Sequence, residues 1–486
     1  LQLEMTSGVN KLDMNVHSNY GYLYDNNNYW TVHYSSIIEK FDKGELADIK
    51  NFCDDEALLF YACVKEFIPK IGPQDTHPML TTGATFIPQV ENNPVMKEVF
   101  LCCGATYLEW YDKSRFSSLS NELYENSQKL INKYLSENEL VGAELWLLAS
   151  FQLLCLRNKI TLSRTVDDCV QCLSNSYRII KNTYYINEPQ AAVDRNKTDS
   201  STPGPLDFGF QNLTYEIENQ IISDSTRNNE LKSELILQPH ERMYIESFIY
   251  NYSVAILFAN DVSDLPNPFL AFKELSHVLR CPIYHCEFEW MNNPVLGSAL
   301  DAFEILAKVS FIARVPMPLD PRSLWYQRAQ QLQNMSAFYT SPVIPTHIKK
   351  LDKQKYASAK LSFLVGKIVT KSCYLLITKI LQYQDFNHRD YHIQMIVTEM
   401  LHAYRAIPRY NNIWGILPWS LVVSGLFVLD ERDREDIFKY LGYVGEISHN
   451  QSTFKLKAFL KKAWGKPTDE GINMLFSRED LCKVTA

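Results

Sequence analysis

The sequence predicts an all-α protein, and three observations support this expectation. Of its 486 residues 46% are hydrophobic, enough for a sizeable core. Tyrosine (28) and phenylalanine (25) are plentiful while glycine (17) is scarce, a combination that favours long elements over a turn-rich β architecture. Apolar side chains recur at helical spacing, and no segment of useful length alternates as a half-buried strand does. We expect a multi-helix array of two lobes packed around an apolar core.

The first part of the chain predicts an arm followed by an N-terminal helical lobe at 51–186. Residues 1–50 are polar and rich in asparagine and tyrosine, which indicates an irregular arm. A helix is expected at 54–68, and another begins after Asn93-Pro94, because asparagine caps helices and proline is favoured at the first helical position. Further helices are expected at 120–135, 140–156 and 165–181. The one at 140–156 is apolar nearly all round and should be central.

A change of composition separates this lobe from a C-terminal lobe at 236–486. Residues 187–235 open with proline, aspartate, serine, threonine and glycine, and are predicted to be a linker or partly disordered loop. Beyond them, helical periodicity predicts helices at 238–260, 325–338, 354–383 and 390–404. A second Asn-Pro pair, Asn293-Pro294, predicts one more helix start.

The stretch at 410–429, YNNIWGILPWSLVVSGLFVL, carries no formal charge and has two readings. It is either a membrane span or the most buried helix of a soluble protein. A span needs about 20 predominantly apolar residues, and Pro418 falls where it would break one continuous helix. We therefore predict no membrane span and a short buried helix from Pro418 to Leu429, with Asp430 capping the next helix. Gly425 would admit a close neighbour, so Pro418 and Gly425 are candidate switch positions.

The charge and the cysteines limit the chemistry. A net charge of −8 argues against nucleic-acid binding by this piece alone. The eleven cysteines lie mostly in apolar runs, which suits free thiols in a reducing compartment. Cys169 and Cys172 could begin a zinc site that Cys281, His285 and Cys286 complete, if the fold brought them together. Ordinary core or surface side chains are the alternative, and no metal ligand is predicted.

Other candidate groups each have a plain structural alternative. His388 and His392 could bind a metal from one helix face, or lie at a solvated helix start. Glu109 and Glu144 could form a buried acid pair, or each could be the polar edge of its helix or pair with a lysine or arginine. Four lysines could meet acidic partners or phosphate, or lie on a solvated helix face: Lys455, Lys457, Lys461 and Lys462. Without a glycine-rich phosphate loop, nucleophile elbow or H-E-x-x-H motif, no catalytic residue and no enzyme activity are predicted.

Four passages together resemble a known family. They are residues 93–105 (NPVMKEVFLCCGA), 241–252 (ERMYIESFIYNY), 293–297 (NPVLG, followed by Phe303 and Leu306) and 417–425 (LPWSLVVSG, followed by Asp433-Arg434 and Trp464). In order and spacing the chain resembles the regulatory domain of fungal zinc-cluster transcription factors, the class of sterol-responsive regulators and of regulators of arginine and lysine biosynthesis. The family's six-cysteine DNA-binding cluster and the Trp-x-x-His-Leu passage usual after the fourth helix are missing.

The resemblance implies a module that controls transcription of metabolic genes and is located in the nucleus, with the cytoplasm as a second location. It would respond to a small hydrophobic or amino-acid-pathway metabolite, or to a partner protein, as a homodimer or with partner transcription factors. DNA binding and zinc would belong to the missing cluster, with no cofactor in this piece. A ligand pocket between helices is expected to use Tyr250, Met400, Trp414, Trp419 and Phe427. The alternative is a helical protein-interaction scaffold without a small-molecule pocket.

Overall fold

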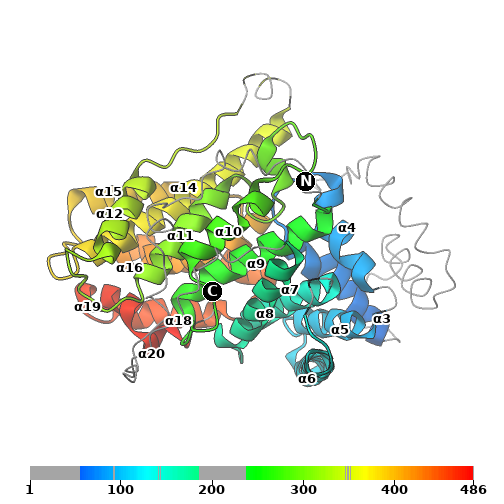
Figure 1. Ribbon diagram of the computed structural model, residues 1–486. Helices are drawn as coiled ribbons and strands as arrows, with labels where there is room; N and C mark the ends of the chain where they lie inside the picture. The colour runs from blue at the N-terminus through cyan, green and yellow to red at the C-terminus, as the bar shows by residue number, and fades with distance from the viewer. Residues whose placement is uncertain are drawn as a thin grey trace, which may run out of the picture.

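The protein is an array of helices (Figure 1), seen in a computed structural model that describes residues 55–90, 93–140, 142, 144–184, 237–344, 346, 350 and 352–484. No strand occurs among these residues, so the predicted all-α class is confirmed. The predicted arm at 1–50 and the predicted linker at 187–235 lie outside the described residues.

The first group of helices runs from α3 to α8. Its members are α3 (Asp55–Ala62), α4 (Thr82–Phe86), α5 (Pro94–Leu108), α6 (Lys113–Glu137), α7 (Leu145–Ile160) and α8 (Asp167–Thr183). A π-helical turn (Cys63–Phe67) and a 3-10 turn (Ile68–Lys70) extend α3. Helix α5 contacts α3, α6 and α7. The predicted start at Asn93-Pro94 is confirmed, because the Asn93 side chain accepts the backbone N–H of Val95 at 3.1 Å.

The second group extends away from α3 to α6, and α12, α14 and α15 lie at the opposite end of the array (Figure 1). Its longer helices are α9 (Pro239–Phe258), α10 (Pro268–Arg280), α11 (Leu300–Ile312), α12 (Leu324–Ala337), α14 (Lys353–Leu381) and α15 (Tyr391–Arg405). They are followed by α16 (Pro418–Phe427), α17 (Glu431–Ser448), α18 (Thr453–Trp464), α19 (Thr468–Asn473) and α20 (Arg478–Leu481). A 3-10 turn, Asn412–Ile416, leads into α16.

Helix α9 joins the two groups. It contacts α7 and α8 of the first group and α10 and α11 of the second. Every residue from Glu241 to Phe258 is buried. The apolar core is therefore continuous from α3 to α20, with α9 running through it.

Sequence analysis missed α10. Its start has the same Asn-Pro signature as α5, and the Asn267 side chain accepts the backbone N–H of Phe269 at 2.9 Å. The apolar residues of α10 face the core at helical spacing. Local capping alone would have located this helix.

The prediction that a helix starts at Asn293-Pro294 is wrong, because α11 begins only at Leu300. Here the asparagine side chain does not cap a helix and instead accepts an N–H of Arg242 at 2.9 Å. The carboxylate of Glu246 takes the backbone N–H groups of Val295 (2.9 Å) and Leu296 (3.1 Å). A long-range partner on α9 thus replaces the local cap.

The short buried helix predicted after Pro418 is present as α16, which ends two residues earlier than predicted, at Phe427. All ten of its residues are buried, and it contacts α14, α15, α17 and α18. Asp430 caps α17 as predicted, accepting the backbone N–H of Arg432 at 2.8 Å. Among the described helices α14 is long and apolar enough to cross a membrane, judged by length and composition only, and 67% of its apolar window is buried.

Gly425 lies in close contact with both α17 and α18. A Cβ at this position would lie 3.2 Å from Ile437 of α17 and 3.2 Å from Leu460 of α18. The Gly425 carbonyl also accepts the indole N–H of Trp464 at 2.9 Å. The predicted close contact is therefore confirmed.

Gly425→Leu is expected to lower the free energy of unfolding by roughly 1–3 kcal/mol, because the added side chain overpacks this contact. Urea unfolding followed by circular dichroism measures the change. Gly442→Ala, within α17, is the control, since its Cβ would meet only the ammonium of Lys457 of α18, at 3.6 Å. Alanine in a helix is favoured over glycine by up to about 1 kcal/mol, so this variant should not lower the free energy of unfolding. Equal stability of Gly425→Leu and wild type would show that α16 is loosely packed.

Candidate functional site

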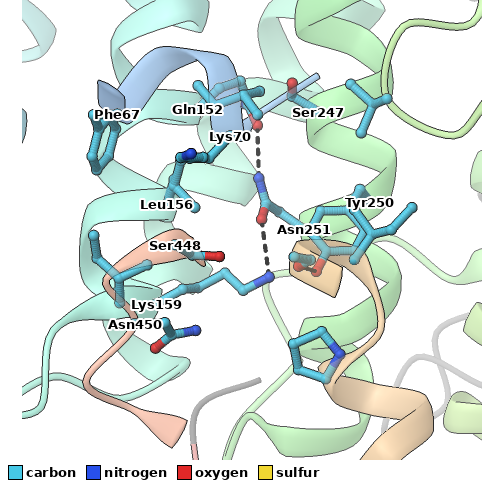
Figure 2. A pocket seen from close by; sticks show the side chains of 16 residues that line it. Phe67, Lys70, Gln152, Leu156, Lys159, Ser247, Tyr250, Asn251, Ser448 and Asn450 are labelled. Carbon is cyan, nitrogen blue, oxygen red and sulfur yellow. Dashed lines mark hydrogen bonds between the residues drawn. The ribbon is translucent and has the colours of Figure 1, made fainter. Parts of the chain in front are cut away.

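A cleft lies where helices from the two groups meet (Figure 2). Its walls come from the turns after α3, from α7 and α9, from the turn before α16, and from the end of α17. The cavity volume is about 40 Å³, and the wider space of about 640 Å³ around it includes open solvent. The lining residues are Phe67, Lys70, Ile71, Gln152, Leu156, Lys159, Ile160, Ser247, Tyr250, Asn251, Val295, Gly415, Ile416, Pro418, Ser448 and Asn450.

Lys159, in the last turn of α7, contributes its ammonium group to this cleft. Its Nζ donates to the side-chain oxygen of Asn251 at 3.4 Å and lies 4.2 Å from the centre of the Tyr250 ring. Asn251 in turn donates to Gln152 at 3.4 Å, as the dashed lines in Figure 2 show. Gln152 continues the chain by donating to the hydroxyl of Ser176 at 3.0 Å. A row of neutral polar groups thus holds the lysine in place.

The Lys159 ammonium has no carboxylate partner among the residues that the structure describes. Only 7% of the residue is exposed, and this burial lowers its pKa to about 8. The nearby thiols of Cys155 and Cys169 oppose the shift only in part. Buried Lys308 is different, because its Nζ lies 2.6 Å from Glu304. A buried ammonium without a counter-ion is costly and is a recognised mark of functional sites.

A second lysine and two hydroxyls complete the polar lining. Lys70 donates to the side-chain oxygen of Asn412 at 3.4 Å, and burial lowers its pKa although the charge of Glu66 acts in the opposite direction. The hydroxyls of Ser247 and Ser448 are buried, and neither has a hydrogen-bond partner among the described residues. The cleft therefore presents hydrogen-bond donors, and no aspartate or glutamate is among its lining residues.

The end of α17 is fixed against the first group of helices by His449. This residue has a left-handed backbone (φ 49°), and its ring stacks on those of Tyr107 (centroids 4.0 Å apart) and Trp110 (5.4 Å). Burial lowers the pKa of His449 to about 4, so the ring is neutral near pH 7. Because Ser448 and Asn450 flank this anchor, both lining side chains have a defined position.

The structure brings two of the predicted site residues to the cleft. Tyr250 lines it and donates its hydroxyl to the Gly415 carbonyl at 3.0 Å, and Pro418 lines it where α16 begins. Four predicted ligand-binding residues do not line it and pack as buried core side chains around α16: Met400, Trp414, Trp419 and Phe427. Gly425 faces α17 and α18. Large aromatic side chains fill the core instead, because burying them removes much apolar surface from water.

Sequence analysis did not identify Gln152, Lys159 or Asn251 as site residues. A signal was present, since each is a polar residue in a helix with enough apolar residues to be expected in the core. A polar residue in such a helix must find a partner or line a cavity. Which of the two applies depends on the neighbouring helix and not on the local sequence.

The cysteine groups lie in different places. Cys169 and Cys172 lie on α8, and the Cys169 thiol donates to the carbonyl of Cys155 at 3.6 Å. The segment with Cys281 and Cys286 follows α10. Within the described part of the chain no group of three or more potential metal ligands occurs.

The remaining candidates have partners within the fold. His388 pairs with Asp469 at 2.8 Å, whereas the ring of His392 bonds the Tyr374 hydroxyl at 3.1 Å, so the two histidines do not share a ligand site. Glu144 accepts the backbone N–H of Gly142 at 2.9 Å just before α7. Among the four lysines of α18, Lys455 donates to the Arg164 carbonyl and Lys462 pairs with Asp480. In the described part of the chain, each of these five side chains therefore has a partner.

Comparisons of the chain with protein-family models, with curated proteins and with solved structures give no match. The geometry of the cleft is therefore the basis for a functional proposal.

Lys159→Met is expected to raise the free energy of unfolding at pH 7 by about 2 kcal/mol, because a pKa shift of one unit corresponds to about 1.4 kcal/mol and the variant also loses a long hydrogen bond. The folded pKa of about 8 lies below the ordinary 10.5, so the ionised lysine destabilises the fold below pH 8. The stability gained by the variant should disappear as the pH rises from 8 towards 10.5. Urea unfolding at several pH values measures it.

Lys308→Met is the matched control. It removes an equally buried ammonium but leaves Glu304 with one cation fewer, so it is expected to lower the free energy of unfolding by about 3 kcal/mol. If Lys159→Met and Lys308→Met lower the free energy of unfolding equally at pH 7, Lys159 is a structural residue, and its interpretation as an unpaired charge of the cleft is wrong.

Proposed function

We propose that this chain is the regulatory domain of a fungal zinc-cluster transcription factor, which senses a small metabolite through the cleft. In this proposal the protein acts in the nucleus, as a homodimer or with partner transcription factors. DNA contact belongs to a zinc cluster that this sequence does not contain. The resemblance of the four sequence passages and the helical architecture support the proposal. The observation that carries it is the composition of the cleft walls.

The cleft walls come from segments far apart in the sequence. Lys159 belongs to α7, Asn251 to α9, Pro418 to the start of α16 and Ser448 to the end of α17. A bound molecule would contact elements of both helix groups at once. Since a ligand shifts a conformational equilibrium by its differential affinity for the two states, contacts across a junction of this kind suit a sensor.

Helix α16 would be the element that transmits occupancy. It begins at Pro418 on the cleft and reaches α17 and α18 at Gly425, where an added Cβ would lie 3.2 Å from side chains of both helices. A displacement of its first turn must therefore be taken up by α17 and α18. In this way the proposed switch positions, Pro418 and Gly425, lie at the two ends of one rigid path.

The scaffold alternative expects no small-molecule pocket. A lined cleft with unpaired buried polar groups favours the sensor, because such groups cost stability unless something pairs with them. The large exposed apolar side chains of the described chain include Tyr111, Phe338 and Tyr391, which lie on separate elements.

Gly415→Leu in the full 486-residue chain, fused to a heterologous DNA-binding domain, tests the proposal. A Cβ at Gly415 would meet only the hydroxyl of the lining residue Ser448, at 3.6 Å, so the backbone has room for a side chain here and a leucine would take up space at the cleft. We expect the wild-type fusion to change reporter transcription several-fold between nutrient media and the variant to respond no longer. Reporter activity and immunoblotted protein level are the measurements.

Gly83→Leu on α4 is the control, since a Cβ there meets only the Ile87 side chain at 3.8 Å and the residue does not line the cleft. It should respond as wild type does. A wild-type fusion whose reporter output is the same in every medium would contradict the sensor, and a normal response of Gly415→Leu would move the sensing site elsewhere.

A further inference from the structure

We infer that the cleft binds a small organic anion, held through a carboxylate or phosphate head by Lys159 and Lys70. This inference rests on the cleft being the ligand site of the proposed sensor. It goes further by assigning the charge and size of the ligand. Three features of the lining support it: its charge, its unpaired donors and its apolar walls.

The charge of the lining has one sign. Two lysines and no carboxylate occur among its residues, although the whole chain carries a net charge of −8. Two other buried cations have acidic neighbours, since Lys308 has Glu304 at 2.6 Å and Arg242 has Glu246 at 4.0 Å. Buried Arg157 instead bonds several neutral groups, among them Ser120 and Asn158 at 3.1 Å, so its donors are well used where those of Lys159 are not. Lys159 is the cleft residue for which a counter-ion has to come from outside the described chain.

The donors of the lining are only partly used. Lys159 makes one long contact of 3.4 Å to Asn251, and an ammonium has three donors. The hydroxyls of Ser247 and Ser448 have no partner among the described residues. The oxygens of a carboxylate or phosphate are acceptors that suit these donors. Charge-assisted bonds of this kind are stronger than bonds between neutral groups.

The apolar walls limit the rest of the ligand. Leu156, Val295 and Ile416 line the cleft beside the polar groups, so a short hydrocarbon chain would be covered. A cationic amino acid would be repelled by the two lysines. A neutral sterol would leave the Lys159 ammonium and both hydroxyls desolvated without a partner, which is unfavourable. A compact anion with a few carbon atoms satisfies both parts of the lining.

Thermal unfolding of the purified 486-residue chain with added glutarate, glycerol 3-phosphate or glutaramide tests the inference. We expect a saturable rise of the thermal midpoint with at least one of the two anions, because a ligand that binds only the native state stabilises it. The better anion identifies the head group. Glutaramide matches glutarate in shape without its charge and should give no rise.

Lys159→Met and Lys70→Met should each weaken binding of the effective anion at least tenfold in isothermal titration calorimetry. Lys462→Met, at an exposed lysine that pairs with Asp480, is the control and should bind as wild type does. Calorimetry at pH 8.5 in two buffers adds an independent readout. An anion that raises the pKa of Lys159 must draw a proton from the buffer, and Lys159→Met should abolish this uptake.

Absence of a midpoint change with both anions overturns the inference, as does equal binding of glutaramide or full affinity in Lys159→Met. These outcomes differ from a failure of the proposed function, which the reporter fusion tests. If an anion binds but the reporter does not respond to the medium, the anion site is supported and the proposed sensor function is contradicted. If the reporter responds but no anion binds, the sensor function is supported and the inference of an anionic ligand is contradicted.

Discussion

Helix α9 is buried along its length, and the other main features of the structure depend on this constraint. It lies between α7 and α8 on one side and α10 and α11 on the other, so its polar side chains have no bulk water to bond with. Each must therefore find a partner inside the protein or lie unpaired at a cost in stability. Arg242, Glu246, Ser247 and Asn251 meet this requirement in different ways.

Two of these side chains organise the backbone of the second helix group. Arg242 bonds the side chain of Asn293, and Glu246 takes the backbone N–H groups of Val295 and Leu296. Burial raises the pKa of Glu246 to about 7, against the opposing effects of Arg242 and these N–H groups. The approach to α11 is thus held by α9, and a tertiary contact decides where α11 begins.

The other two side chains face the cleft, where polar groups are left incompletely paired. Asn251 bonds Gln152 and Lys159, while the hydroxyl of Ser247 has no partner among the described residues. A fold selected for stability alone would place apolar side chains here. Proteins commonly give up stability at functional sites, and the contrast between unpaired Lys159 and paired Lys308 is the clearest sign of such an exchange in this molecule.

The sequence by itself determined the helical class, most helix positions and the buried character of α16, because these depend on apolar periodicity and on local caps. The three Asn-Pro pairs mark the limit of this information. Two begin helices through the asparagine side chain, whereas Asn293 gives its oxygen to Arg242. The cleft likewise depends on long-range partners that local sequence does not reveal. Tyr250 was predicted as a ligand-binding residue and Pro418 as a switch position, and both line the cleft. The partners of Lys159 come from α9, and only the packing of distant segments could place them together.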